Sequence, residues 1–313
     1  MDNKDIDLVY LWVDGNDPKW QKKKQTFTGK VSDTSEYNNI GRYISSDELK
    51  YALRSAERYT PWIRKIFIVT DDQKPEWLET SNPKVQLVDH HEIMPAEILP
   101  CFNSSVIEYF LHKIPGLSEH FLFSNDDMFF NADLLPDFFF AKDGFPIVRL
   151  KRKLLGKWHY RLEVLIKKPG QYNQSLIDAA SIVEQIFGKY YSGYPHHNVD
   201  AYRKSDYRMA TEEIFSEQIK NTSHHRVRAY GDLQRLAFSL YTLAIGHGHL
   251  KYVGRSESKR ILTHKRDLMK YINRYQPKLF CLNDSQRVTD EHRKKIKPFL
   301  ESLFPVKSKF EKP

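Results

Sequence analysis

The expected fold is decided by the stretch His120-Phe121-Leu122-Phe123-Ser124-Asn125-Asp126-Asp127-Met128-Phe129-Phe130. An apolar run of strand length leads into Asn125, Asp126 and Asp127, and apolar residues then resume. Such a run is typical of a buried strand, although periodicity alone does not separate it from a buried helix segment. If the run is a strand, the three polar residues lie at its C-terminal end. That edge is where ligands bind in open α/β sheets.

The two adjacent carboxylates of this stretch suggest a cation site. Asp126 and Asp127 repel each other unless a proton or a cation lies between them. Paired oxygen ligands at a strand end suit a hard ion such as Mg²⁺ that also carries phosphates. A solvated turn with an Asx cap explains the three residues equally well when they are considered alone.

Further segments of the same kind surround this stretch. Ile6–Val13 ends in Asp14-Gly15, Ile66–Thr70 ends in two aspartates, and Val85–Asp89 is followed by two histidines. Between the first two, Ser45 and Glu48 have the spacing of a capping box, and apolar residues then recur with the period of a helix up to about Tyr59. The alternation predicts an α/β fold with a mostly parallel, doubly wound, Rossmann-like sheet. The chain contains neither GxGxxG nor GxxxxGK[ST].

The pattern changes after residue 148. Helices are expected over about 175–187, 209–220 and 231–245, so residues 149–313 should form a largely helical cap on the core formed by residues 1–148. The cap begins with a basic stretch, residues 149–168, which holds eight Lys and Arg residues against one acid. Because no repeat or low-complexity linker separates the halves, we expect one composite domain.

Composition limits the functional classes. The 313 residues are 40% hydrophobic and 28% charged, which is a globular composition, and the net charge of +9 points to anionic partners. No apolar run approaches the roughly 20 residues that span a bilayer. The polar start of the chain predicts no signal peptide, and two distant cysteines predict no disulfide framework. We therefore expect a cytoplasmic protein.

Several single residues could contribute to chemistry. His197 lies in an aromatic loop, and a histidine can act as a general base near neutral pH. Arg54 and Arg228 could hold phosphate oxygens, because a guanidinium offers a planar fork of donors. Asp284 follows an apolar run and repeats the Asn-Asp pattern of the first stretch. Each of these residues has a structural explanation as well, and the histidines show no zinc-binding spacing.

Taken together, the segments resemble the Stealth family of hexose-1-phosphate transferases, which build phosphodiester-linked capsular and cell-wall polysaccharides and include the lysosomal-enzyme N-acetylglucosamine-1-phosphotransferase as an animal relative. The resemblance is carried by four regions in order along the chain: Ile6–Gly15, Leu49–Leu78 continuing to Asn125-Asp126-Asp127, Pro195–Asp200 with Val227-Arg228 and Asp232-Leu233-Gln234, and Cys281–Asp284.

The resemblance implies an enzyme whose N-terminal core binds a UDP-sugar. The acceptor would be a hydroxyl of a growing polysaccharide or a lipid-linked oligosaccharide, UMP would be released, and a divalent metal ion, Mg²⁺ or Mn²⁺, would assist. The family's catalytic positions correspond to Asp127, His197, Arg228 and Asp284. Substrate-binding positions are assigned to Asp14, Gly15, Arg54 and Asn125, and the metal to Asp126 with Asp127. Either His197 or Asp127 could deprotonate the acceptor.

Two other functions fit parts of the sequence. A metal-dependent glycosyltransferase of the GT-A type also places acids at a strand end, but it would release UDP. A nucleic-acid binder would explain the net charge alone, yet no recognised motif supports it, so no nucleic-acid partner is predicted. The basic run Arg293–Lys297, with the lysines after it, could hold the enzyme peripherally at an anionic membrane face.

Overall fold

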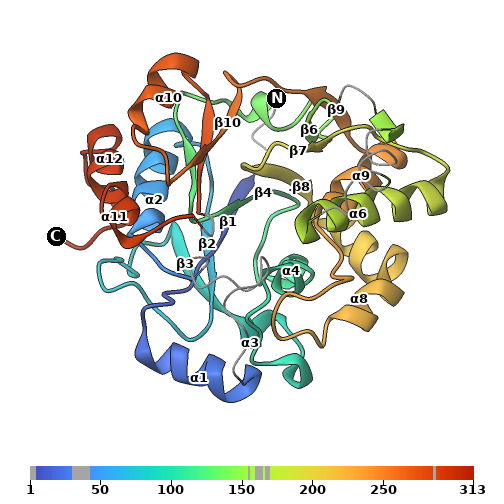
Figure 1. Cartoon of the computed structure of the whole chain (residues 1–313), viewed down its shortest axis with the longest axis horizontal. Helices are drawn as coiled ribbons and strands as arrows, with labels where there is room; N and C mark the ends of the chain where they lie inside the picture. Colours follow the sequence, from blue (N-terminus) through green and yellow to red (C-terminus); the bar gives the residue numbers. More distant parts are fainter. Residues whose placement is uncertain (1–4, 30–42, 154–155, 159–164, 166–169, 285–286) are drawn as a thin grey trace.

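The central sheet of the protein has both faces covered by helices. The computed structural model describes residues 5–29, 43–153, 156–158, 165, 170–284 and 287–313. Five strands form the sheet in the order β3-β2-β1-β4-β8. They are β1 (Ile6–Leu11), β2 (Ile66–Thr70), β3 (Val85–Asp89), β4 (His120–Asn125) and β8 (Asp200–Arg203). All neighbouring pairs are parallel except β4 and β8, so the carboxyl ends of β1 to β4 meet at one edge (Figure 1).

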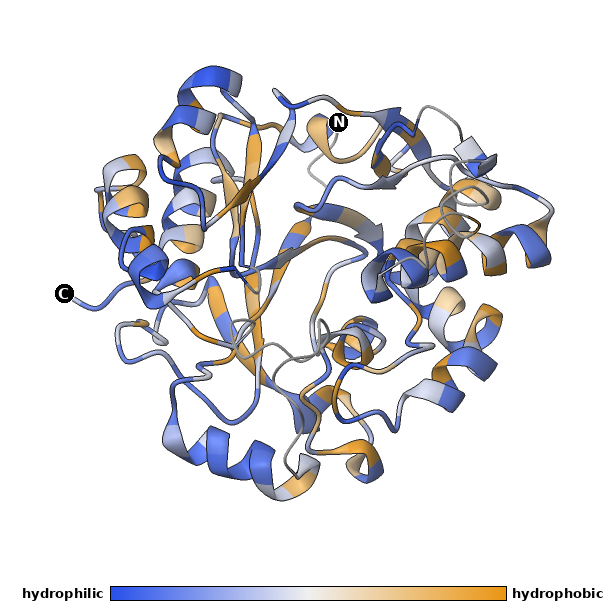
Figure 2. Cartoon of the chain, in the orientation of Figure 1, coloured by the Kyte–Doolittle hydropathy of each residue, from blue (hydrophilic) through white to orange (hydrophobic). Residues whose placement is uncertain are grey.

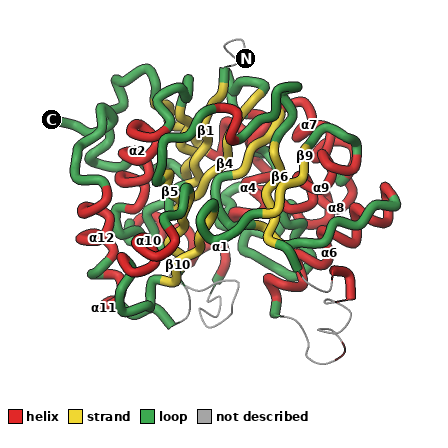
Figure 3. Tube along the Cα trace, turned by 90° about the horizontal axis from the view of Figure 1, so that it is seen from above, coloured by secondary structure: helices red, strands yellow, loops and turns green. Residues whose placement is uncertain are grey.

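Alternate residues of β1 enter two separate cores, because successive side chains of a strand point to opposite faces. Leu8 and Tyr10 pack with α2 (Glu48–Tyr59), while Val9 and Leu11 pack with the other core, which contains α4 (Ser104–Glu108) and α9 (Leu236–Ala244). Seen from above, α2 and α12 (Ile296–Leu303) lie on one side of the sheet, and α9 and α8 (Ser216–Thr222) lie on the other (Figure 3). The doubly wound α/β prediction is confirmed.

Apolar composition follows this layering. The strands β1 and β2 and the helix α9 are mostly hydrophobic, whereas α1 (Pro18–Thr28) is mostly hydrophilic (Figure 2). In α1 only Trp20 is buried, so this helix lies on the surface, where the Trp20 ring and an ion pair between Lys23 and Asp71 attach it. The buried runs of β1, β2 and β4 explain why sequence patterns located these strands correctly.

The second half of the chain supplies helices and also short strands. Its longer helices, α6 (Gln171–Phe187) and α9, match the expected positions, and α7 (Lys204–Met209), a π-helical turn (Ala210–Ile214) and α8 occupy the third expected region. Two three-stranded sheets were not anticipated: β10-β11-β5 and β7-β6-β9. Their strands are β5 (Met128–Phe130), β6 (Ile147–Lys151), β7 (Tyr194–Pro195), β9 (His249–Tyr252), β10 (Ser258–Leu262) and β11 (Leu279–Asn283).

The remaining elements are short connections. They are α3 (His90–Ile93), α10 (Met269–Tyr275), α11 (Asp290–Arg293) and 3₁₀ turns at Ala96–Ile98, Leu111–Lys113 and Pro136–Phe138. Within the part of the chain that is described, no helix is both long enough and apolar enough to cross a bilayer. Three cations of the basic stretch 149–168 lie outside the described residues: Arg161, Lys167 and Lys168.

Candidate active site

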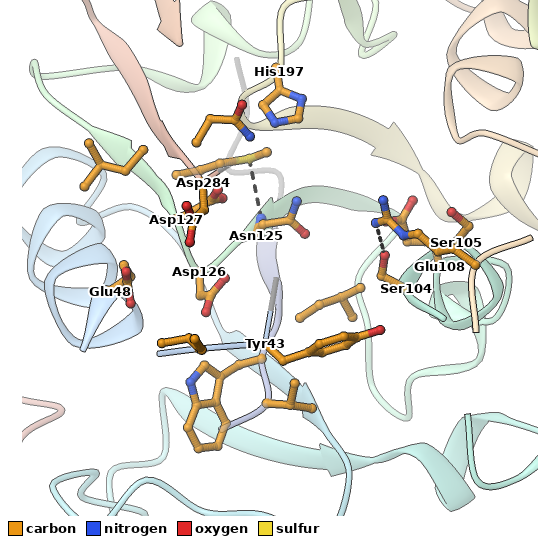
Figure 4. Close-up of a pocket in the computed structure, with 18 of the residues that line it drawn as sticks. Tyr43, Glu48, Ser104, Ser105, Glu108, Asn125, Asp126, Asp127, His197 and Asp284 are labelled. Carbon is orange, nitrogen blue, oxygen red and sulfur yellow. Dashed lines mark hydrogen bonds between the residues drawn. The ribbon is translucent and has the colours of Figure 1, made fainter. Parts of the chain in front are cut away.

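A pocket of about 690 Å³ opens at the carboxyl edge of the central sheet. Its walls come from the ends of β1, β4, β10 and β11, from the loop between β7 and β8, and from the segment before α9. The pocket brings together six residues that the sequence singled out: Asn125, Asp126, Asp127, His197, Arg228 and Asp284 (Figure 4). These residues lie up to 159 positions apart in sequence and meet only through the fold.

The acidic wall of the pocket is built where β4 passes into β5. The carbonyl of Asp127 accepts a hydrogen bond from the N–H of Leu282 at 2.9 Å, and Met128 pairs with Cys281 across the β5–β11 ladder. The Cys281 thiol also lies 3.4 Å from Oδ2 of Asp127 and donates to it. Since β11 ends at Asn283, this pairing positions Asp284 beside the two adjacent aspartates.

Burial and mutual repulsion disfavour negative charge on this wall. Burial raises the pKa of Asp126 to about 8, and the charge of Asp127 contributes to the rise. Burial likewise raises the pKa of Asp127 to about 7, against the hydrogen bond from Cys281, which lowers it, and the charges of Glu48 and Asp284 add to the rise. A divalent cation would relieve this repulsion and keep both carboxylates ionised.

Glu48 is a member of the acidic wall that the sequence did not reveal. Burial raises its pKa to about 8, and the charge of Asp126 raises it further. The expected capping box with Ser45 is wrong, because α2 begins directly at Glu48 and its N-cap is Asp47. The Glu48 side chain accepts from the N–H of Ser46 at 2.5 Å and lines the pocket (Figure 4).

The donor set fits a metal ion that shares its coordination with a substrate. No group of three His, Cys, Asp or Glu side chains among the described residues could hold an ion alone. However, Oδ1 of Asp127 is buried and has no hydrogen-bond partner there. Mg²⁺ is commonly bound through one or two carboxylates, with water and substrate phosphates completing its shell. Asp126 and Asp127 are therefore the residues that could hold it.

Two neighbouring histidines have separate places in the site. His196 is buried, and its ring nitrogens lie 3.0 Å from Ser258 Oγ and 3.1 Å from Asp200 Oδ1. His197 adopts a left-handed backbone with φ 58° and lines the pocket, where its ring meets Tyr172 edge-on at 6.4 Å. The structure thus distinguishes His197, which faces the pocket, from His196, which fastens the loop.

Several arginine side chains lie near His197. Burial lowers the pKa of His197 to about 3, and the charges of Arg260 and Arg235 lower it further, so its imidazole is neutral. Arg228 donates from Nη2 to the hydroxyl of Ser104 at the start of α4 (Figure 4). Arg235 is held more firmly, because it contacts Asp200 at 2.9 Å and Glu108 at 3.3 Å. Arg235 also lines the pocket, and no sequence pattern singled it out.

The expected substrate role of Arg54 does not fit the structure. This residue lies outside the pocket, on the face of α2 turned toward the C-terminal segment. Its Nε and Nη2 donate to the two carboxylate oxygens of Glu311 at 2.7 and 2.9 Å, and Nη1 donates to the carbonyl of Phe304. All of its nitrogens are thus engaged in holding the end of the chain against α2. This correction follows from a contact across 257 positions, which no local pattern shows.

Asp14 and Gly15 also lie outside the lining of the pocket, so direct substrate contact is not supported for them. Gly15 instead affects the pocket through its contact with Tyr43. Its N–H donates to the carbonyl of Tyr43 at 2.7 Å, and a Cβ on Gly15 would lie 2.1 Å from that same oxygen. Tyr43 lines the pocket beside Trp20, with 5.2 Å between the ring centroids. Gly15 therefore permits the close approach that positions Tyr43.

The basic run near the C-terminus is largely paired with carboxylates. Arg293 contacts Asp284 and Asp290, both at 3.0 Å, and lines the pocket. Lys294 contacts Glu291 at 2.6 Å, and Lys297 contacts Asp47 at 3.1 Å. These pairs reduce the charge available to an anionic membrane, and the peripheral membrane contact remains a prediction.

Three segments of the chain match the models of one protein family. Residues 4–32 match Stealth protein conserved region 1, residues 42–148 match conserved region 2 and residues 270–313 match conserved region 4. Exopolysaccharide phosphotransferase cps2G of Lactiplantibacillus plantarum is 31% identical over 333 residues, which cover 98% of this chain and 96% of the relative. The chain belongs to the Stealth family.

Other Stealth relatives carry names of the same kind. Capsular polysaccharide phosphotransferase SacB of Neisseria meningitidis serogroup A is 32% identical over 323 residues, or 99% of this chain and 57% of SacB. Exopolysaccharide phosphotransferase SCO6023 of Streptomyces coelicolor is 35% identical over 98% of this chain and 52% of its own length. The chain thus spans little more than half the length of these two relatives.

Solved structures that are similar to this Stealth chain include two glycosyltransferases. LgtC in complex with donor and acceptor sugar analogues is 11% identical over 97% of this chain and 98% of its own, with a TM-score of 0.45. GlyE from Streptococcus pneumoniae TIGR4 is 14% identical over 79% of this chain and 45% of its own, with a TM-score of 0.39.

Proposed function

We propose that this Stealth protein is a phosphotransferase that moves a sugar-1-phosphate from a UDP-sugar to a hydroxyl of a growing polysaccharide or lipid-linked oligosaccharide. The single observation that carries the proposal is the opposition of charges in one pocket. Asp126, Asp127 and Asp284 form one wall, Arg228 and Arg260 face the same space, and His197 lies with them. Such a site can hold a metal-bound diphosphate with a neutral base beside it.

The proposed reaction is an in-line displacement at the phosphorus nearest the sugar. The acceptor oxygen forms a bond to this phosphorus, and the bond from phosphorus to the bridging oxygen of the diphosphate breaks. UMP leaves with that oxygen, and the acceptor hydroxyl gives up its proton. The product is a phosphodiester between sugar and acceptor. Phosphoryl transfer of this kind depends mainly on positioning and on neutralising phosphate charge.

We assign His197 as the base that takes the proton from the acceptor hydroxyl. A base must be unprotonated before it acts, and burial together with the neighbouring arginines keeps this imidazole neutral. Bound phosphates would bring negative charge near His197 and raise its pKa toward a value useful for proton transfer. Asp127 is the alternative base, but its unpartnered Oδ1 is better suited to a cation.

The remaining residues are assigned to charge. Arg228 and Arg260 would bind non-bridging phosphate oxygens through their planar forks of donors. Asp126 and Asp127 would hold Mg²⁺ or Mn²⁺, which neutralises charge on the leaving UMP. Asp284 is oriented by Arg293 and completes the acidic wall. Tyr43 and Trp20 present aromatic rings at the far end of the pocket, where a uracil base could stack.

A glycosyltransferase of the GT-A type is the second candidate, because acids at a strand end can equally hold a metal-bound UDP. The two functions differ in the bond that breaks and therefore in the nucleotide released. The test is incubation with a panel of UDP-sugars, Mg²⁺ and an oligosaccharide acceptor, followed by separation of the nucleotides. Acceptor-dependent UMP supports the proposal, whereas acceptor-dependent UDP overturns it in favour of glycosyl transfer.

A further inference from the structure

A surface rich in cations and tyrosine rings borders the pocket. It extends over β6, β9, β10 and α10, which lie along the upper edge of Figure 1. We call it the cationic face and define it by six residues: Lys151, Arg152, Tyr252, Arg255, Lys259 and Tyr275. The sequence from 249 to 278 is correspondingly basic, with nine Lys and Arg residues against two acids.

Three of the four cations of this face contact aromatic rings: Arg152, Arg255 and Lys259. Arg152 lies 4.9 Å from the ring centroid of Tyr252, and Lys259 lies 5.2 Å from that of Tyr275. Arg255 donates to the hydroxyl of Tyr275 at 2.9 Å. Among the described residues, Lys151, Arg152, Arg255 and Lys259 form no ion pair with a carboxylate. By contrast, the neighbouring Arg149 and Lys251 share Glu257, at 2.8 and 2.9 Å.

These cations lie close enough to repel one another. Burial lowers the pKa of Lys151 to about 8, and the charges of Arg260, Lys259 and Arg255 lower it further. A cluster of like charges that forms no ion pair with a described carboxylate is relieved by a bound anion.

The cationic face continues into the pocket through Arg260. Lys259 and Arg260 are successive residues of β10, so their side chains point to opposite faces of the strand. Lys259 meets the rings of α10, whereas Arg260 lines the pocket. Because β10 is at the edge of its sheet, no other described strand separates the two sides. An extended molecule whose end lies in the pocket can therefore pass Arg260 and reach Lys151 and Lys259.

We infer that the cationic face binds the growing phosphodiester-linked glycan behind its acceptor end. This inference rests on the proposed function, because each sugar-1-phosphate transfer adds one negative charge to the product. Cations that form no ion pair with a described carboxylate match those phosphodiesters, and the tyrosine rings between them match the apolar faces of sugar rings. A surface of this kind would favour long acceptors over short ones, since each added repeat brings another contact.

The test uses the full chain with Arg255→Gln and Lys259→Gln combined. Both side chains can be neutralised without leaving a buried acid unpaired, so the fold should be retained. The matched control combines Arg208→Gln and Lys220→Gln, which removes the same charges from exposed positions of α7 and α8. Binding is measured with a size-fractionated phosphodiester-linked polysaccharide, neutral dextran, a single-stranded oligonucleotide, and vesicles of phosphatidylcholine and phosphatidylglycerol.

The wild type and the control should bind the phosphodiester polymer alike, and the Arg255/Lys259 variant should bind it about tenfold or more weakly. In transfer assays the variant should raise KM for long acceptors and leave KM for a single-repeat acceptor unchanged. Equal polymer affinity in all three proteins would overturn the inference. So would tighter wild-type binding of the oligonucleotide or the vesicles than of the polymer. A wild type that releases no UMP contradicts the proposed function, a result separate from either of these.

Discussion

Leu282 donates its main-chain N–H to the carbonyl of Asp127 at 2.9 Å, and this bond joins the two acidic segments of the site. The segments are 155 positions apart in sequence, yet the ladder between β5 and β11 makes them one wall. If this wall binds a metal-bound diphosphate, the carboxylates of both segments contribute to one binding site. The consequences can be tested residue by residue.

The first prediction concerns metal dependence. Asp126→Asn and Asp127→Asn should each lower turnover on the order of 10²-fold or more, because each removes an anionic oxygen ligand. Chelation of divalent ions should abolish activity, and added Mg²⁺ should restore it. Calorimetric titration of each protein with UDP in the presence of Mn²⁺ measures nucleotide binding separately from turnover. Asp133→Asn, at an exposed position outside the pocket, is the control and should leave both quantities unchanged.

The second prediction separates the two histidines. His197→Ala should lower turnover by about 10²–10⁴-fold with little effect on thermal stability, because this ring serves as the proposed base. Added imidazole should restore part of the lost rate. His196→Ala should instead lower the free energy of unfolding by about 1–3 kcal/mol, since it removes one hydrogen-bond partner each of Ser258 and Asp200. A His197→Ala protein with near-normal turnover would eliminate the assignment.

The third prediction concerns the buried ion pair between Arg54 and Glu311. Arg54→Ala should destabilise the protein by about 3–5 kcal/mol, because it leaves the buried Glu311 carboxylate with only the more distant Lys50 as a cationic partner. Combining Arg54→Met with Glu311→Leu should recover most of that loss. Chemical denaturation of the three proteins measures the effect. If Arg54 instead bound substrate, the single variant would lose activity at unchanged stability.

The same ion pair gives a pH dependence. Burial alone would raise the pKa of Glu311, but hydrogen bonds from Arg54 and the Ser308 N–H bring it below the ordinary value. A carboxyl whose folded pKa is lowered contributes stability above its unfolded pKa, and this contribution is lost as the pH falls through the folded pKa. Stability should therefore decline below about pH 4.3, the unfolded value for Glu. In Glu311→Gln this part of the decline should be absent.

The fourth prediction concerns Gly15. In Gly15→Ala the added Cβ would lie 2.1 Å from the Tyr43 carbonyl oxygen, so the main chain of Tyr43 must move. A displacement of about 1 Å beside a binding site can lower kcat/KM on the order of 10²-fold. Gly254→Ala is the matched control, because its Cβ would meet no atom within 4 Å. Equal kcat/KM for both variants would exclude a role for Gly15 in shaping the pocket.

Local patterns predicted the parts of the structure that depend on local sequence. The buried runs of β1, β2 and β4 have strand length and end in polar residues, so the sheet and its ligand-binding edge could be inferred from them. No local pattern grouped Asp127, His197, Arg228 and Asp284; only the family resemblance identified them as one set of catalytic residues. The pocket geometry then brought them together.

Other features depend on contacts between distant segments. Glu48 has the spacing of a capping residue, and its position on the acidic wall follows only from where α2 packs. Arg54 has the appearance of a phosphate ligand until the C-terminal segment is placed beside it. The strand β10 is rich in polar residues and lacks a strand's alternation, so its pairing with β11 was not anticipated.

The most direct test of the central claim follows one phosphorus atom. A UDP-sugar labelled at the phosphorus nearest the sugar is incubated with the protein, Mg²⁺ and an oligosaccharide acceptor, and polymer and nucleotide are then separated. The account predicts that the label appears in the polymer in a phosphodiester, with unlabelled UMP in equal amount. Label that remains in UDP while sugar enters the polymer would contradict it.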